Sequence, residues 1–285
     1  MDLDLFRKII DEYADMGGGS LGLTPTVGEA LLDKHLIERI QYARSRPEIT
    51  SIFMFSNMIS LDRVGAENLV HSGISSIIVS VSGLDAAQYK RVYRSDMYSK
   101  VITNISTLIA ANKAAGSPVD VSLTMRSDRP LSEVVKSADY IGLAEAMGAD
   151  KISIKFRYDD WSVRIKPSML SGGMKIRSLM PARISPCSIM FTGPMIFWDG
   201  CVGACGCRDV DADSLIIGDI RKQHLGEIWF GPEIAKLRNE FLTKSIQPIC
   251  DNCTHYTNLA SWARPSYQER FYAIQPCNWE HKRPS

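Results

Sequence analysis

The chain has 285 residues, of which 45% are hydrophobic and 23% are charged, as expected for a folded protein with a full apolar core. Its 33 Lys and Arg residues balance 32 Asp and Glu residues, which argues against nucleic acid or an anionic membrane surface as a partner. Since the sequence has neither an apolar run of the roughly 18 to 20 residues that span a bilayer nor a secretory signal, we expect a cytoplasmic protein.

Helical and strand patterns alternate over the first 156 residues. The continuous apolar runs at 49–57 and 74–83 indicate strands that are buried on both faces. Strands that alternate with helices indicate βαβ units, so we expect an α/β fold with a parallel sheet that forms a partial TIM-like (β/α) barrel. Helices are expected at 3–16, 31–44, 63–73, 97–116 and 131–149. A strand that runs into a loop is expected at 20–28, and further strands at 49–57, 74–83, 118–126 and 150–156.

The pattern changes after about residue 160. A segment rich in Pro, Gly, Ser and Met, at 166–186, is typical of a connection between domains. A short strand is expected at 214–220, and a helix at 231–242. We therefore predict four parts: a barrel at 1–160, a connector at 161–186, a small α+β subdomain at 187–257 and a tail at 258–285.

All seven cysteines lie after residue 186. Cys250 and Cys253 form a C-x-x-C pair, in which two thiolates can reach one metal centre from a tight turn. Cys187 and Cys205 flank the segment 196–200, where Asp-Gly predicts a hairpin turn that would bring them together. Clustered thiols in a reducing compartment indicate metal binding more than disulfides, and four thiolates suit either zinc or an iron–sulfur cluster.

The remaining cysteines have less definite roles. Cys207 could replace Cys205 as a ligand, whereas Cys201 lies in the predicted turn and is expected to point elsewhere. Cys277 stands alone near the C-terminus. Any of these thiols could also be a small buried hydrophobic group.

The cysteine spacing and the segments between the cysteines resemble a known family. The order Cys187-x12-Gly200-x4-Cys205, followed by "LIIGDI", "LGEIW", "LRNEF" and C-x-x-C, is similar to the auxiliary-cluster region of radical S-adenosylmethionine enzymes, the SPASM and shorter twitch subdomains. The full SPASM pattern continues with two more cysteines, where this chain has "THYTNLASW". The resemblance therefore implies the twitch-like form with one auxiliary [4Fe-4S] cluster.

The predicted strand ends resemble the cofactor-binding motifs of the same family. Gly28-Glu29 resembles the Gly-Glu pair that recognises the amino group of S-adenosylmethionine, although Ala30 stands where the family usually has Pro. A carboxylate beside backbone carbonyls suits an ammonium group. Arg126, which ends the strand expected at 118–126, could meet the carboxylate of the cofactor. The implied cofactor-binding set is Gly28, Glu29, Ser56, Asn57, Ser80, Ser82 and Arg126.

Each of these residues also has a structural explanation. Glu29 could simply begin the following helix, and Arg126 could be an ordinary surface arginine. Asn57, Ser80 and Ser82 could be turn residues at strand ends.

The C-x-x-x-C-x-x-C motif that holds the catalytic cluster of this family does not occur in these 285 residues. Two explanations are open: an N-terminally truncated chain, or a degenerate homologue. We favour truncation, because a degenerate enzyme would keep the first strand, whose loss exposes a sheet edge. S-adenosylmethionine, a second [4Fe-4S] cluster and a reductant such as flavodoxin or ferredoxin are then expected only for a full-length form.

The resemblance implies an oxidoreductase or maturase that uses a 5'-deoxyadenosyl radical to abstract hydrogen from a peptide or a small carbohydrate-like substrate, and that is inactive as given. Trp161, after the last barrel strand, could face the substrate or simply pack. The alternatives are a non-catalytic iron–sulfur or zinc-binding homologue that acts as a binding partner, and a zinc-ribbon interaction module.

Overall fold

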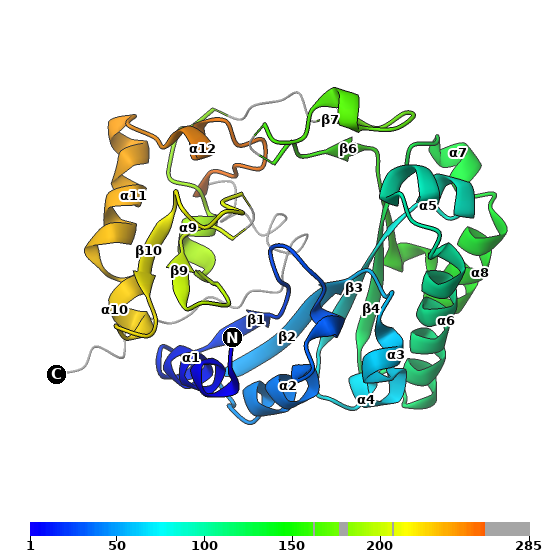
Figure 1. Ribbon diagram of the computed structural model, residues 1–285, viewed down its shortest axis with the longest axis horizontal. Helices are drawn as coiled ribbons and strands as arrows, with labels where there is room; N and C mark the ends of the chain where they lie inside the picture. Colours follow the sequence, from blue (N-terminus) through cyan, green and yellow to red (C-terminus); the bar gives the residue numbers. More distant parts are fainter. Residues whose placement is uncertain (162, 177–181, 207, 260–285) are drawn as a thin grey trace.

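The computed structural model describes residues 1–161, 163–176, 182–206 and 208–259 (Figure 1). Its largest element is a five-stranded sheet in the order β1-β2-β3-β4-β5, and every neighbouring pair is parallel. Figure 1 shows the helices along the outer side of this curved sheet, with the cysteine-rich part of the chain across from its inner side. The strands are β1 (Gly19–Gly22), β2 (Ile49–Ser56), β3 (Ser76–Ser82), β4 (Asp120–Arg126) and β5 (Ile152–Lys155).

The helices of this part lie mostly where the apolar spacing predicts them. The first begins at the N-cap Asp2, whose carboxylate accepts a hydrogen bond of 2.7 Å from the Leu5 backbone N–H. The elements are α1 (Leu3–Asp15), η1 (Ala30–Leu32), α2 (Leu36–Arg44), α3 (Leu61–Val64), α4 (Ala66–Val70), α5 (Ala86–Tyr93), α6 (Tyr98–Ala114), α7 (Leu131–Val134), α8 (Ala138–Met147) and η2 (Ala149–Lys151).

The strand expected to run into a loop at 20–28 is present, since β1 ends at Gly22 and no strand continues to Gly28. Two expected helices need correction. The single helix expected at 63–73 is divided into α3 and α4 by Gly65, whose φ of +83° interrupts the helical backbone. The helix expected at 131–149 is divided into α7 and α8, because Ser137 adopts an extended conformation and caps α8.

The two faces of the sheet differ in burial. In β2, Ile52 and Met54 are fully buried, whereas Phe53 and Phe55 are partly exposed. The expectation that this strand is buried on both faces is therefore wrong, because the helices cover the outer face alone. The inner face carries both apolar side chains, such as Phe53 and Phe55, and polar ones, and the register places Ser82 beside Arg126 on it.

The connector is more structured than its composition predicts. The chain leaves β5 into β6 (Arg157–Tyr158), passes through η3 (Pro167–Met169) and returns in β7 (Lys175–Ile176), which pairs with β6 in parallel. This segment therefore folds back beside the end of the large sheet.

The cysteine-rich part contains a three-stranded antiparallel sheet in the order β10-β9-β8. The predicted hairpin is confirmed: Gly200, with φ of +92°, donates its N–H to the Phe197 carbonyl at 3.0 Å between β8 and β9. Its elements are β8 (Met195–Ile196), β9 (Cys201–Gly203), β10 (Ile216–Asp219), α9 (Ile189–Thr192), α10 (Leu225–Trp229), α11 (Pro232–Thr243) and α12 (Pro248–Asp251).

Helix α1 joins the two parts of the molecule. Ile10 is fully buried in the core beneath the large sheet, whereas the neighbouring Ile9 is buried in the core of the cysteine-rich part. Polar contacts hold the same junction, since Lys8 Nζ donates to the Ile220 carbonyl at 2.7 Å and Glu12 Oε2 accepts from Leu225 N–H at 2.7 Å. The first helix therefore belongs to both cores.

None of the helices within the described ranges combines the length and the apolar character that crossing a bilayer requires.

The division of α1 between two cores leads to a testable prediction. Ile9→Ala and Ile10→Ala are each expected to lower the free energy of unfolding by about 2–5 kcal/mol, because each leaves a cavity in a packed core. Hydrogen exchange should distinguish them: Ile9→Ala should expose amides of α10 and β10, and Ile10→Ala those of α2 and β2. Identical exchange patterns in the two variants would contradict the assignment of α1 to two cores.

Candidate functional site

Four cysteines that are distant in sequence line one cavity of the cysteine-rich part. Cys187 precedes α9, Cys205 follows β9, Cys250 lies in α12 and Cys253 follows it. The hairpin of β8 and β9 and the short helix α12 bring them together. Most of the other lining side chains are apolar, and those with polar groups are Arg208, His255 and Tyr256.

The other cysteines differ in position. Cys201 lies at the start of β9, outside this cavity, and its N–H donates to Asp199 Oδ1 at 3.1 Å. Cys207 and Cys277 lie outside the described residues. The four cysteines that the sequence analysis grouped thus line one cavity, and their role as metal ligands stays a prediction.

The environment of the cavity disfavours bare thiolates. Burial raises the pKa of the Cys187 thiol. It also raises the pKa of Cys250, and the negative charges of Cys205, Cys187 and Cys253 raise it further. Thiolates here therefore need a positive group between them, and the donor set of four cysteine sulfurs fits zinc or a four-iron cluster. Among the described residues, however, no three His, Cys, Asp or Glu side chains converge as a single metal ion requires.

Arg183, which the sequence analysis did not identify, holds the C-x-x-C turn. Its guanidinium donates to the carbonyls of Cys250 at 3.2 Å, Asp251 at 2.7 Å and Cys253 at 2.7 Å. The same guanidinium lies 4.6 Å from the ring centroid of Tyr256. A lone arginine in a segment rich in Pro and Ser gives no signal in a single sequence, because its partners are backbone groups some seventy residues away.

Glu29 connects two of the predicted strand ends. Its Oε1 accepts from Ser56 Oγ at 2.6 Å and its Oε2 accepts from Asn57 N–H at 2.8 Å. Its Oε1 also accepts from Leu31 N–H at 3.2 Å, which caps η1. The helix-starting role of Glu29 is therefore present, and the same carboxylate gathers Ser56 and Asn57. Gly28, with φ of +129°, is exposed beside it.

The other predicted strand-end residues lie on the inner face of β3 and β4. Ser80 pairs in register with Thr124, and Ser82 with Arg126. Ser82 is fully buried, whereas Arg126 is exposed and its guanidinium lies 5.4 Å from the ring centroid of Tyr158. The structure thus places both serines and Arg126 at the carboxyl edge of the sheet, where ligands of α/β proteins bind.

The strand-end edge and the cysteine cavity are linked directly. Thr26, two residues before Gly28, donates its Oγ1 to the carbonyl of Gly206 at 3.0 Å, and Gly206 follows Cys205. The loop after β1 is therefore held against the loop that carries one of the cavity cysteines.

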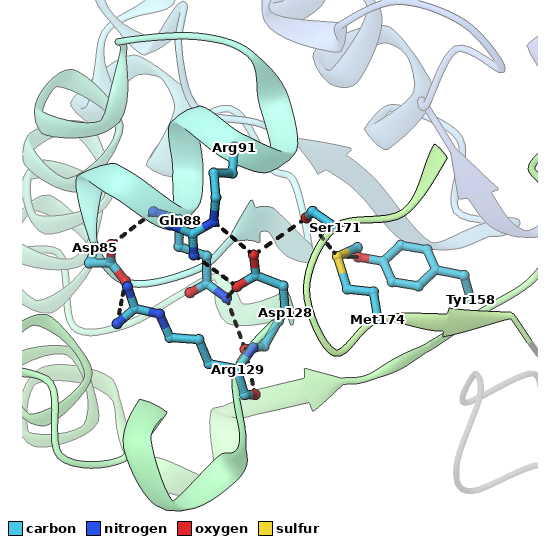
Figure 2. A network of polar contacts seen from close by, with 9 residues as sticks. Asp85, Gln88, Arg91, Asp128, Arg129, Tyr158, Ser171 and Met174 are labelled. Carbon is cyan, nitrogen blue, oxygen red and sulfur yellow. Dashed lines mark hydrogen bonds and ion pairs between the residues drawn. The ribbon is translucent and has the colours of Figure 1, made fainter. Parts of the chain in front are cut away.

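A buried carboxylate, which the sequence analysis missed, organises the region beside this edge (Figure 2). The side chain of Asp128 is 2% exposed and forms an ion pair of 3.1 Å with Arg91. It also accepts from Gln88 Nε2 at 2.5 Å and from Ser171 Oγ at 3.4 Å. Asp128 therefore joins the end of β4, helix α5 and the connector. A lone Asp after a strand is too common to reveal this role from sequence.

Comparisons with known proteins agree with this arrangement. Residues 187–254 match SPASM, an iron-sulfur cluster-binding domain. Over 127 residues, 42% of this chain, the sequence is 35% identical to the GTP 3',8-cyclase of Mycolicibacterium smegmatis (strain ATCC 700084 / mc(2)155). That alignment covers 33% of the cyclase, so the chain spans about a third of the length of the curated relative it matches.

The fold is similar to that of BtrN. The structure of BtrN in complex with AdoMet and 2-DOIA superposes with a TM-score of 0.57 at 17% identity, over 92% of this chain and 83% of BtrN. BtrN in an open conformation gives a TM-score of 0.51 at 14% identity, over 93% and 86% of the two chains. Together the comparisons confirm the predicted resemblance: a partial barrel of the radical S-adenosylmethionine type, followed by a SPASM iron–sulfur domain.

The Asp128 network should make stability depend on pH. Burial by itself would raise the pKa of this carboxyl, but hydrogen bonds from Arg91, Gln88 and Ser171 outweigh it and lower the pKa. A carboxyl whose pKa is lower in the folded state stabilises the fold above its unfolded pKa of about 3.9, and this contribution is lost as the pH falls through the folded pKa.

Asp128→Asn should therefore lower the free energy of unfolding at pH 7 by about 1–3 kcal/mol and flatten its decline below pH ~4. Urea unfolding of both proteins from pH 7 to pH 3 tests this. Asp96→Asn, which removes an exposed carboxylate paired with Lys90, serves as the control and should leave the pH profile nearly unchanged. A decline in Asp128→Asn as steep as in the parent would contradict the prediction.

Proposed function

We propose that this chain is part of a radical S-adenosylmethionine oxidoreductase or maturase, in which four cysteines hold one auxiliary [4Fe-4S] cluster. The observation that carries the proposal is the shared cavity of Cys187, Cys205, Cys250 and Cys253 within the region that matches an iron-sulfur cluster-binding domain. The Thr26–Gly206 contact supports it, because it holds this cavity beside the carboxyl edge of the sheet.

The match of residues 187–254 to an iron-sulfur cluster-binding domain favours a cluster over zinc. Four cysteine sulfurs suit either group by their donor type alone. The apolar walls of the cavity, which include Met190 and Phe241, would keep water from it.

The protein's own residues would then have separate tasks. The four cysteine sulfurs bind the cluster, Arg183 fixes the C-x-x-C turn, and the apolar side chains set the low polarity of the site. When bound, an iron–sulfur cluster supplies one-electron transfer. One-electron transfer suits oxidation of a substrate radical. The bound cluster could also help to place the substrate.

The strand-end edge is the proposed site for S-adenosylmethionine. Its amino-acid group carries an ammonium and a carboxylate, and the edge offers Glu29 for the first and Arg126 for the second. Gly28, Ser56, Asn57, Ser80 and Ser82 lie along the same edge and complete the proposed set.

A small-molecule substrate is favoured over a peptide. The cyclase is named for GTP, and BtrN was solved with 2-DOIA, so both relatives point to small molecules. We propose a cytoplasmic location, with flavodoxin or ferredoxin as the reductant of a form that also carries the catalytic cluster.

One observation favours a second candidate function. These 285 residues contain no C-x-x-x-C-x-x-C motif. A non-catalytic homologue that binds an auxiliary cluster and acts as a binding partner would lack this motif too. The two functions share the cysteine cavity and differ in whether the strand-end edge binds S-adenosylmethionine. The DNA directly upstream of Met1 distinguishes them: an in-frame C-x-x-x-C-x-x-C motif there would support the first function, and its absence would support the second.

The ligand assignment predicts which cysteines are needed for iron. The chain purified without oxygen should contain about four irons. Cys205→Ala should lose most of them, whereas Cys201→Ala, a matched change outside the cavity, should keep them. Iron analysis and visible absorption test this. If Cys205→Ala keeps its iron and Cys207→Ala loses it, the ligand is Cys207; one zinc in a colourless protein rejects the cluster.

The missing motif predicts the absence of one activity. The 285-residue chain, loaded with iron and sulfide and supplied with S-adenosylmethionine and dithionite, should form no 5'-deoxyadenosine, because no cysteine precedes Cys187 to hold a catalytic cluster. Chromatographic detection of 5'-deoxyadenosine tests this, with an active radical S-adenosylmethionine enzyme as the positive control. Its formation by the chain alone would show that another set of residues does the cleavage.

A further inference from the structure

A buried arginine lies in the wall of the cysteine cavity. Arg208 follows Cys205 by three residues, lines the cavity, and has a side chain that is 8% exposed. Burial lowers the pKa of its guanidinium, and the Cys253 sulfur, which forms a hydrogen bond with it, opposes this effect. Because an arginine stays protonated in proteins, this wall carries a fixed positive charge next to the cysteines.

An aspartate at the end of the barrel fixes the position of that charge. Asp159, which follows β6, forms an ion pair with Arg208 and is itself 12% exposed. Asp159 Oδ1 also accepts from Trp161 N–H at 2.7 Å and from Thr254 Oγ1 at 3.3 Å. The carboxylate is therefore held both by its own loop and by the residue after Cys253.

The indole of Trp161 completes the surroundings of the guanidinium. Its ring centroid lies 5.7 Å from the Cζ of Arg208, within the range of a cation–π contact. Trp161 has a φ of +51°, which is uncommon for a bulky residue. The loop thus presents a carboxylate and an aromatic face to one arginine, which is a more specific arrangement than packing alone requires.

We propose that Arg208 raises the reduction potential of the iron–sulfur cluster and that Asp159 positions its guanidinium for this purpose. The inference rests on the proposed function, since it requires a cluster at the four cysteines. Reduction by one electron adds a negative charge to the cluster, and a fixed cation a short distance away favours the reduced form. Net charge, hydrogen bonds to sulfur and solvent exposure set the potential of such clusters, and Arg208 contributes to the first two.

Two other arginines of the cysteine-rich part are arranged differently. Arg183 donates to three backbone carbonyls of the C-x-x-C turn, so it holds the turn. Arg221 lies on the surface in an ion pair of 2.8 Å with Asp219, where solvent screens its charge. Arg208 combines burial, a place in the cavity wall and contact with a cavity cysteine sulfur.

The test measures the potential of the cluster, with the full chain loaded with iron and sulfide and titrated with dithionite under EPR detection. Arg208→Gln should shift the equilibrium at least tenfold toward the oxidised form, about 59 mV to lower potential for one electron. Arg208→Lys keeps the charge and should shift it less. Arg221→Gln, which removes an exposed arginine from the same subdomain, is the matched control and should leave the potential unchanged.

Iron content distinguishes the two proposals. A parent chain without iron would overturn the proposed function and this inference together. A loaded Arg208→Gln protein with the parent potential would overturn the inference alone. If Arg208→Gln does not take up iron, Arg208→Lys decides: it keeps the charge but loses the guanidinium geometry, so its potential should lie below that of the parent, and a potential equal to or above the parent's would overturn the proposal.

Discussion

Four half-buried thiols that line one cavity, and whose thiolates need a positive charge between them, are the constraint on which the second half of this molecule depends. Their ionised form is costly in an apolar cavity, and burial raises the pKa of both Cys187 and Cys250. Two arginines offset this cost. Arg183 donates hydrogen bonds to the backbone carbonyls of the C-x-x-C turn and fixes it, and Arg208 adds a buried cation to the wall of the cavity. Much of the architecture from α9 to α12 can be understood as a support for this cavity.

The cysteine-rich part that carries this cavity packs against the part of the chain that forms the large sheet. Its small core is completed by Ile9 of the first helix, and its loops are fixed by Thr26 on one side and by Asp159 on the other. A small domain buries too little apolar surface to be very stable alone. Shared packing therefore holds the cavity and the carboxyl edge of the sheet in one fixed relation.

Sequence reasoning predicted the fold class, and it grouped the four cysteines that the structure places around one cavity, because both leave local signals. Apolar periodicity predicts the strands, and the spacing from Cys187 to Cys253 with its intervening motifs predicts the subdomain. It failed where the determinant is distant in sequence. Whether β2 is covered on one face or two depends on where the rest of the chain lies. Arg183 and Asp128 act through partners that no local pattern indicates, and the division of helix 131–149 follows from the cap at Ser137.

Glu29 shows that a structural and a binding role can coexist in one side chain. An ionised carboxylate has about four acceptor positions. Ser56 Oγ and Leu31 N–H occupy Oε1, and Asn57 N–H occupies one position on Oε2. Among the hydrogen bonds of the described residues, one position on Oε2 is therefore left after the loop has been tied to β2 and η1 has been capped. The three internal hydrogen bonds fix the orientation of the Glu29 carboxylate when the chain folds. Binding of a ligand ammonium would therefore cost no further side-chain entropy at Glu29.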